Sequence, residues 1–176
     1  MRFIVLLGLT IALAVCGVAQ AVDAPDFELK ELDGKEYALE DLLEGCDLLV
    51  IDFWQVGCKP CNELVAHLQE YYDEYQEDGV EIVIISRDTA LTLSQVAPFF
   101  RTNEYTFRVL LDSELDVSKD YGVNASPVTF IINPEGEIIW RHYNYRSGQE
   151  KEIEEVIEKY LAGEKVEFPE DDGAEE

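Results

Sequence analysis

The fold is decided by one stretch of this sequence, Asp52-Phe53-Trp54-Gln55-Val56-Gly57-Cys58-Lys59-Pro60-Cys61. The run 48–51 before it is short, apolar and rich in branched side chains, as in a buried strand. The segment 62–72 after it places apolar residues at helical spacing. The two cysteines therefore lie where a strand is predicted to pass into a helix.

The spacing of these cysteines suits thiol chemistry. Cys58 and Cys61 lie three residues apart, so a helix places them on one face and within disulfide reach. Pro60 suits a first helical turn, where its missing N–H costs nothing. The free N–H groups and positive dipole end of the helix stabilise a thiolate at Cys58, which Lys59 follows directly. We expect Cys58 to be the attacking thiolate and Cys61 the resolving thiol of a thiol–disulfide exchange.

Two other interpretations of the cysteine pair stay open at this point. The pair could be a static structural disulfide, or it could be half of a metal site. A structural zinc site takes four ligands, and the sequence has no second CxxC or CxxH to complete them. Two thiolates can also hold Cu(I).

Asp52 ends the predicted strand, six residues before Cys58. Aspartate is disfavoured in strands and costly when buried, so its position among apolar residues needs a reason. Burial should raise its pKa and let it take the proton from Cys61 when a mixed disulfide is resolved. The alternative is that Asp52 caps local backbone. Trp54 is predicted to be buried under the loop that carries the cysteines.

A second informative run lies far downstream, at residues 121–133, and contains Ser126-Pro127-Val128-Thr129-Phe130. Together with Asp52-Phe53-Trp54 and Cys58-Lys59-Pro60-Cys61, this run resembles the thioredoxin superfamily. The resemblance covers about residues 24–162. It implies an α/β, thioredoxin-like fold: a central mixed β-sheet flanked by helices, with an N-terminal β-hairpin. Thioredoxins give the aspartate that matches Asp52 the proton-accepting role.

Three shorter features are similar to the extracytoplasmic TlpA/ResA-like reductases: Ala24-Pro25-Asp26-Phe27, Asp33-Gly34-Lys35 and Ser86-Arg87-Asp88. The resemblance implies a catalytic set of Cys58, Cys61 and Asp52. It also implies that Pro127 is cis and packs beside the disulfide, where it blocks metal from the CxxC. The backbone of Ser126 would then pair with an incoming extended peptide as an added strand. The implied substrate-binding residues are Trp54, Gly57, Lys59, Pro60, Ser126 and Pro127.

The sequence departs from its relatives at three positions. Gly57 replaces the tryptophan that thioredoxins place before the first cysteine, and Gln55 replaces a small residue. The substrate-facing rim should therefore be more open. Leu64 stands where some ResA-like proteins carry a catalytic glutamate, so that role is absent or passes to Asp52 or Glu63.

The function that follows is an exported thiol–disulfide oxidoreductase that reduces protein disulfides and needs no cofactor. The resemblance implies two partners: a client protein bearing a disulfide, with cytochrome c apoprotein as the suggested client, and a membrane or soluble thiol electron donor. A disulfide oxidase or isomerase is an alternative. A Cu(I)-binding module is another, but copper-delivery relatives use CxxxC with a distant histidine. Peroxiredoxins place a threonine where Gln55 stands.

Residues 1–21 have the pattern of an export signal: Arg2, an apolar core, and an Ala19-Gln20-Ala21 cleavage site. This predicts an extracytoplasmic protein, in the periplasm or cell envelope. A retained membrane anchor is the alternative, and 13–16 faintly resembles a lipoprotein box. We expect the thioredoxin-like domain to span 22–162 and an acidic, disordered tail to span 163–176.

The chain is strongly acidic, with 38 Asp and Glu against 13 Lys and Arg and a formal net charge of −25. This argues against nucleic acid as a partner, and against membrane contact except through the signal or anchor. The acidity can serve solubility alone, or it can steer basic partners. Removal of residues 1–21 would leave Cys46 as an odd thiol: inert, a second resolving cysteine, or a dimer link. A monomer is the expected state.

Hydrophobic periodicity and turn residues predict the remaining elements. The predicted strands are 27–30, 36–38, 47–54, 80–85, 107–111, 128–132 and 137–142. The predicted helices are 39–43, 60–77, 93–103, 114–121 and 149–161. Within 93–103, Pro98 should kink the helix or mark its true start.

Overall fold

The computed structural model describes residues 22–168. Over this part of the chain, eight strands form one mixed sheet in the order β1-β8-β7-β4-β5-β6-β2-β3. The strands are β1 (Val22–Asp23), β2 (Glu28–Glu31), β3 (Glu36–Ala38), β4 (Leu48–Trp54), β5 (Val80–Ser86), β6 (Arg108–Leu111), β7 (Val128–Ile132) and β8 (Glu137–Tyr143).

The centre of the sheet is built from apolar runs because both of its faces are covered. All seven residues of β4 are buried, and β5 lies parallel to it. Strand β7 pairs with β4 on the other side in antiparallel register, which places Thr129 opposite Asp52. The carboxyl ends of β4 and β5 therefore meet the amino end of β7 at one edge of the sheet, and the redox motif follows β4 at that edge.

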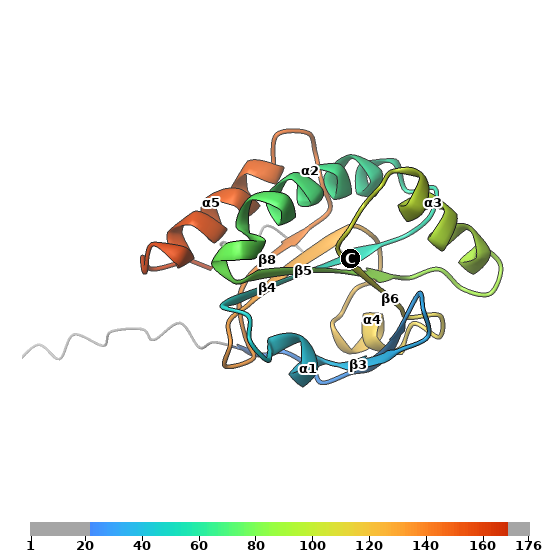
Figure 1. Ribbon diagram of the computed structural model, residues 1–176, viewed down its shortest axis with the longest axis horizontal. Helices are drawn as coiled ribbons and strands as arrows, with labels where there is room; N and C mark the ends of the chain where they lie inside the picture. Colours follow the sequence, from blue (N-terminus) through green and yellow to red (C-terminus); the bar gives the residue numbers. More distant parts are fainter. Residues whose placement is uncertain (1–21, 169–176) are drawn as a thin grey trace, which may run out of the picture.

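Helices cover both faces of the sheet (Figure 1). Helices α2, α3 and α5 lie on one face, and α1 and α4 lie on the other. Their bounds are α1 (Leu39–Leu43), α2 (Lys59–Tyr75), α3 (Val96–Thr102), α4 (Asp116–Asp120) and α5 (Glu150–Leu161). Two short 3-10 helices, Gln76–Asp78 and Leu93–Gln95, extend α2 and precede α3.

The alternation of side chains along β4 divides the interior into two cores. Leu48, Val50 and Trp54 pack beneath α2, in the same core as Cys61. Leu49, Ile51 and Phe53 pack in the second core, on the face that carries α1 and α4. Asp52 shares the alternation of Val50 and Trp54, so its carboxyl group points toward the core beneath α2.

Most predicted elements are confirmed, including the hairpin at Asp33-Gly34 and the antiparallel pair 128–143. Three details differ. The pair β1–β8 was not predicted because two residues are too few to show a pattern. Helix α2 ends at Tyr75, and Gly79 follows the 3-10 turn with a φ of 87°. Pro98 neither kinks nor starts α3: it lies in the first turn, where its missing N–H is harmless.

The structure also bears on the ends of the predicted domain. Val166 packs against the core beneath α2, and Phe168 packs against the second core, where Arg141 lies 5.5 Å from its ring centre. The predicted signal 1–21 and the end of the predicted tail, 169–176, lie outside the described residues. Within 22–168, no helix is long and apolar enough to cross a bilayer.

Candidate active site

The two cysteines of the motif form a disulfide at the start of α2. Cys58 and Cys61 are bonded, with 5.3 Å between their Cα atoms. Cys58 is the N-cap residue, and its sulfur accepts a hydrogen bond from the N–H of Cys61 over 3.2 Å. Cys61 is fully buried, whereas Cys58 is only partly buried. An incoming thiol or disulfide can therefore reach Cys58 and not Cys61.

The segment before β7 lies against the exposed sulfur. The Ser126–Pro127 peptide bond is cis, as the resemblance implied. The carbonyl oxygen of Ser126 lies 3.6 Å from the sulfur of Cys58. On the other side, the N–H of Asn144 donates to the carbonyl of Pro127 over 2.9 Å. The cis segment is thus fixed between the disulfide and the residue that follows β8.

Asp52 is buried beneath the site without a charged partner. Its Oδ1 accepts a hydrogen bond from the hydroxyl of Thr129 over 2.9 Å, while Oδ2 has no hydrogen-bond partner in the described part of the chain. Burial raises the pKa of Asp52 to about 7, and the Thr129 hydrogen bond opposes this shift. The carboxyl group bonds a side chain and not the backbone, which rules against the capping alternative. A carboxyl group with this pKa can gain or lose a proton near neutral pH.

The strand end Ser86-Arg87-Asp88 holds both loops of the site. The buried carboxylate of Asp88 accepts from the N–H of Val56 and from the hydroxyl of Ser86, each over 3.0 Å. It thereby ties down the loop just before Cys58.

Arg87 holds the other loop. Its guanidinium group donates to the carbonyl of Val123 over 3.1 Å and to the hydroxyl groups of Ser118 and Ser126 over 3.0 and 3.3 Å. Sequence reasoning noted this tripeptide only as a family feature and assigned it no role.

The comparisons with known proteins agree with this geometry. Residues 21–141 match the AhpC/TSA family. The chain belongs to this family. The thiol-disulfide oxidoreductase ResA of Bacillus thuringiensis subsp. konkukian is 33% identical over 139 residues, which cover 79% of this chain and 75% of that protein. With the bonded cysteine pair, this identifies the chain as a thioredoxin-like thiol–disulfide oxidoreductase, as the sequence predicted.

Two solved structures show the same fold. One, assigned as the thiol:disulfide interchange protein DsbE of Chlorobium tepidum, superposes with a TM-score of 0.73 at 24% identity and covers 82% of this chain and 99% of that one. A thioredoxin-like protein from Porphyromonas gingivalis has a TM-score of 0.69 at 29% identity and covers 78% of this chain and 91% of that one.

The rim of this oxidoreductase carries three of the residues expected to bind substrate. Gly57, Lys59 and Pro60 are exposed around Cys58. Gly57 has a φ of 80°, in the left-handed region that disfavours a side chain, so the turn itself favours glycine where thioredoxins have tryptophan. Lys59 is paired with Glu63 over 3.7 Å.

Two further positions bear on the proton acceptor. Leu64 is a buried residue with an apolar side chain, which has no group for proton transfer. Glu63 is exposed and faces Lys59. Asp52, by contrast, is a fully buried carboxyl group on the Cys61 side of the sheet.

The prediction that Trp54 is buried is confirmed, and the expectation that it also contacts substrate is wrong. Its side chain is 0% exposed, and its indole N–H donates to Asn62 over 3.0 Å. Its ring packs on those of Phe99 and Phe100. Trp54 therefore anchors the first turn of α2 from below, and Asn62, which sequence reasoning missed, is its partner.

Cys46 lies at the opposite edge of the sheet from the disulfide. It precedes β4, and seven strand residues at about 3.3 Å each separate it from the redox edge. It is half-buried, and burial raises the pKa of its thiol, with the charge of Glu81 adding to the shift. Cys46 cannot resolve a mixed disulfide at Cys58 within one molecule.

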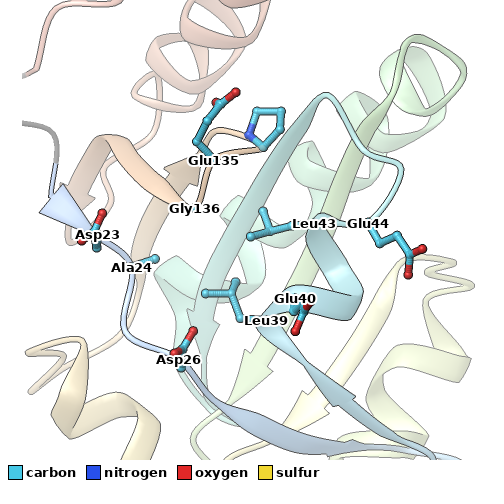
Figure 2. Close-up of a pocket in the computed structure, with 10 residues that line it drawn as sticks. Asp23, Ala24, Asp26, Leu39, Glu40, Leu43, Glu44, Glu135 and Gly136 are labelled. Atoms are coloured by element: carbon cyan, nitrogen blue, oxygen red, sulfur yellow. The ribbon is translucent and has the colours of Figure 1, made fainter.

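One large hollow lies away from the redox edge. It has a volume of about 750 Å³ and lies between α1, the segment 23–26 and the turn 134–136 (Figure 2). The side chains of Asp23, Asp26, Glu40, Glu44 and Glu135 line it. The turn follows β7, so the hollow is at the amino end of β4 and takes no part in the thiol chemistry. Within residues 22–168, no three His, Cys, Asp or Glu side chains cluster to hold a metal ion.

Proposed function

We propose that this chain works outside the cytoplasm as a reductase of protein disulfides. The observation that carries the proposal is the asymmetry of the cysteine pair: a reachable Cys58 at the helix N-terminus and a buried Cys61 on the side of the sheet that holds Asp52. A reductase needs this arrangement, because one thiol must meet the client and the other must wait for the mixed disulfide.

The reaction begins from the reduced form. The Cys58 thiolate attacks one sulfur of the client disulfide, and the other client sulfur leaves as a thiolate. The N–H of Cys61 and the positive end of α2 stabilise the Cys58 thiolate before the attack. The client segment extends beside the cis segment, where the backbone of Ser126 is available for strand pairing.

Resolution requires that Cys61 lose its proton. Asp52, with a pKa of about 7, accepts this proton, and the Cys61 thiolate attacks the sulfur of Cys58. The second client sulfur leaves as a thiolate, and the Cys58–Cys61 disulfide forms. Two electrons have then passed to the client. A membrane or soluble thiol donor returns two electrons to the pair.

Three further parts of the proposal rest on the sequence and the resemblance. Residues 1–21 direct export and lie outside the described residues. The apoprotein of cytochrome c is the proposed client, in keeping with relatives named ResA and DsbE. The thiol donor that returns electrons to the cysteine pair is the third part.

The reduction potential of residues 22–176 tests the proposal. The protein is equilibrated in thiol–disulfide buffers, quenched, and its free cysteines are counted by mass tagging. A reductase should have a potential near about −270 mV, as thioredoxin has, and not near about −120 mV, as the oxidant DsbA has. A potential near the oxidising value of DsbA would contradict the reductase proposal and would favour a disulfide-forming enzyme. The Cys46→Ser variant serves as the control, because its two remaining cysteines must give the same value.

A further inference from the structure

Asp52 exchanges its proton from a position that water does not reach. Its side chain is 0% exposed, and it points into the core that holds Val50, Trp54 and Cys61. Ile84 of β5, which is paired with Asp52 on one side, is also 0% exposed. Because a protonated carboxyl group cannot accept the proton of Cys61, Asp52 depends on a route by which its own proton can leave.

A polar route begins on the other side of Asp52. Thr129 of β7 is paired with Asp52, and its hydroxyl group donates to Oδ1 over 2.9 Å. The next strand, β8, places His142 in register with Thr129. Four neighbouring strands therefore carry one row of residues, in the order Ile84, Asp52, Thr129 and His142. This row is apolar toward β5 and polar toward β8.

The side chain of His142 lies on the same face of the sheet as that of Asp52. Its ring stacks on the ring of Trp140, with centres 5.7 Å apart and planes 10° apart, and Trp140 belongs to the core beneath α2. Helix α5 lies on this face as well (Figure 1), and its Glu152 is 3.8 Å from Nδ1 of His142. Directly opposed side chains on one face of antiparallel strands have Cβ atoms about 4.5–5.5 Å apart, so the Thr129 and His142 side chains are neighbours.

The row reaches water at His142. The His142 side chain is 12% exposed, and that of Glu152 is 52% exposed. An imidazole group accepts and releases protons near neutral pH. A carboxylate beside Nδ1 favours the tautomer that carries its proton on that nitrogen, which leaves Nε2 to accept a proton from the hydroxyl group of Thr129.

The ring of His142 is faced by acids from two elements. The Glu152 carboxylate approaches it from α5, and the Asp52 carboxyl group lies across β7 from it, on β4. Glu150, at the start of α5, accepts instead from the hydroxyl group of Tyr145 over 2.7 Å. The imidazole therefore lies between a buried and an exposed carboxyl group.

We propose that Thr129 and His142 carry the proton of Asp52 to and from water. The carboxyl proton passes to the Thr129 hydroxyl group as that group gives its own proton to Nε2 of His142, and the imidazolium then releases a proton from Nδ1 to water beside Glu152. Thr129 and His142 end with as many protons as they had, and Asp52 is left as the carboxylate. The reverse sequence protonates Asp52. The inference rests on the proposed function, in which Asp52 accepts the proton of Cys61.

Proton release can be measured on the oxidised protein without turnover. A protonated carboxyl group has an infrared C=O band that a carboxylate lacks, and the band that disappears in Asp52→Asn belongs to Asp52. After a jump from pH 5 to pH 8, the decay of this band gives the rate of release. His142→Ala should slow the decay at least about tenfold, as expected for the loss of an acid–base group, and added imidazole should restore the rate.

Two matched controls separate the relay from packing. His67→Ala removes the same group from the exposed face of α2, where His67 pairs with Glu70, and should leave the decay unchanged. Thr129→Ser keeps the hydroxyl group and should keep the rate within about twofold, whereas Thr129→Val keeps the shape without the hydroxyl group and should slow the decay at least about tenfold.

Equal decay rates in wild type, His142→Ala and Thr129→Val would overturn the relay and leave the proposed function standing, because Asp52 would still titrate. Equal slowing by His142→Ala and His67→Ala would also overturn it. If the pH jump revealed no band that Asp52→Asn removes, the proposed role of Asp52 as proton acceptor would be overturned, and the relay with it.

Discussion

When Asp52 is replaced by asparagine, the stability of the oxidised variant relative to oxidised wild type should increase as the pH rises. The wild-type carboxyl group has its pKa raised from 3.8 to about 7 by burial. Between these two values the unfolded chain releases a proton that the folded chain keeps, so wild-type stability falls as the pH rises through this window. The full penalty, about 4 kcal/mol, is reached above pH 7. Asparagine does not titrate, so the variant does not lose stability in this way.

The measurable part of this effect lies between pH 5 and pH 8. Over that interval, linkage gives a loss of about 2.5 kcal/mol for a group whose pKa moves from 3.8 to about 7. Asparagine can still accept the hydrogen bond from Thr129, but its buried amide N–H₂ lacks a partner and costs about 1–3 kcal/mol. That cost does not depend on pH. The test therefore uses the change with pH of the difference in unfolding free energy between variant and wild type, and not the absolute value of that difference.

Urea unfolding of residues 22–176 in the oxidised form, at pH 5, 6, 7 and 8, gives the free energy of unfolding for both proteins. The difference between Asp52→Asn and wild type should grow by about 2.5 kcal/mol from pH 5 to pH 8. A difference that stays constant within about 0.5 kcal/mol would refute the raised pKa of Asp52. Thr129→Val is the companion variant: loss of the hydroxyl group should raise the pKa of Asp52 further and move the transition to higher pH.

The same variant tests the proton transfer. In a single turnover at pH 7, Asp52→Asn should form the mixed disulfide at the wild-type rate and resolve it about 100-fold more slowly, since general bases typically contribute 10²–10⁴-fold. Quenched samples analysed by mass would show the mixed disulfide accumulating. Unchanged resolution would remove Asp52 from the mechanism.

Three further predictions concern the surroundings of the disulfide. Arg87→Gln should speed amide hydrogen exchange in the segment 123–126 at least about tenfold, because the hydrogen bonds of Arg87 to Ser118, Val123 and Ser126 are lost. Unchanged exchange would mean that other contacts hold the cis segment. Gly57→Ala should cost about 1 kcal/mol in urea unfolding, since its φ of 80° disfavours a side chain although the space around it is open; a stabilised variant would contradict the turn geometry. Cys46→Ser should leave the rate of mixed-disulfide resolution unchanged, and a slower rate would show that Cys46 reaches Cys58 after all.

Local features of this chain could be predicted from its sequence because they depend on neighbouring residues. The apolar run of β4, the helix that begins next to Cys58 and the hairpin at Asp33-Gly34 follow from side-chain pattern and turn chemistry. The cysteine spacing and Pro60 likewise predicted a pair at the helix N-terminus. The oddity of an aspartate in a buried strand was enough to single out Asp52.

The supporting structure of the site was decided by the tertiary fold. Thr129 lies 77 residues from Asp52 in the chain, and only the antiparallel register of β7 against β4 makes it the donor to that carboxyl group. Arg87 meets Ser126 because β5 ends beside the loop that leads into β7. The burial of Trp54 was predicted from the sequence, but its partners, the rings of Phe99 and Phe100 on α3, were decided by the tertiary packing. Sequence pattern indicates which face of one element is buried, whereas strand order and register decide which distant side chains meet. Those contacts moderate the pKa of Asp52, which burial raises, and they set the geometry around Cys58.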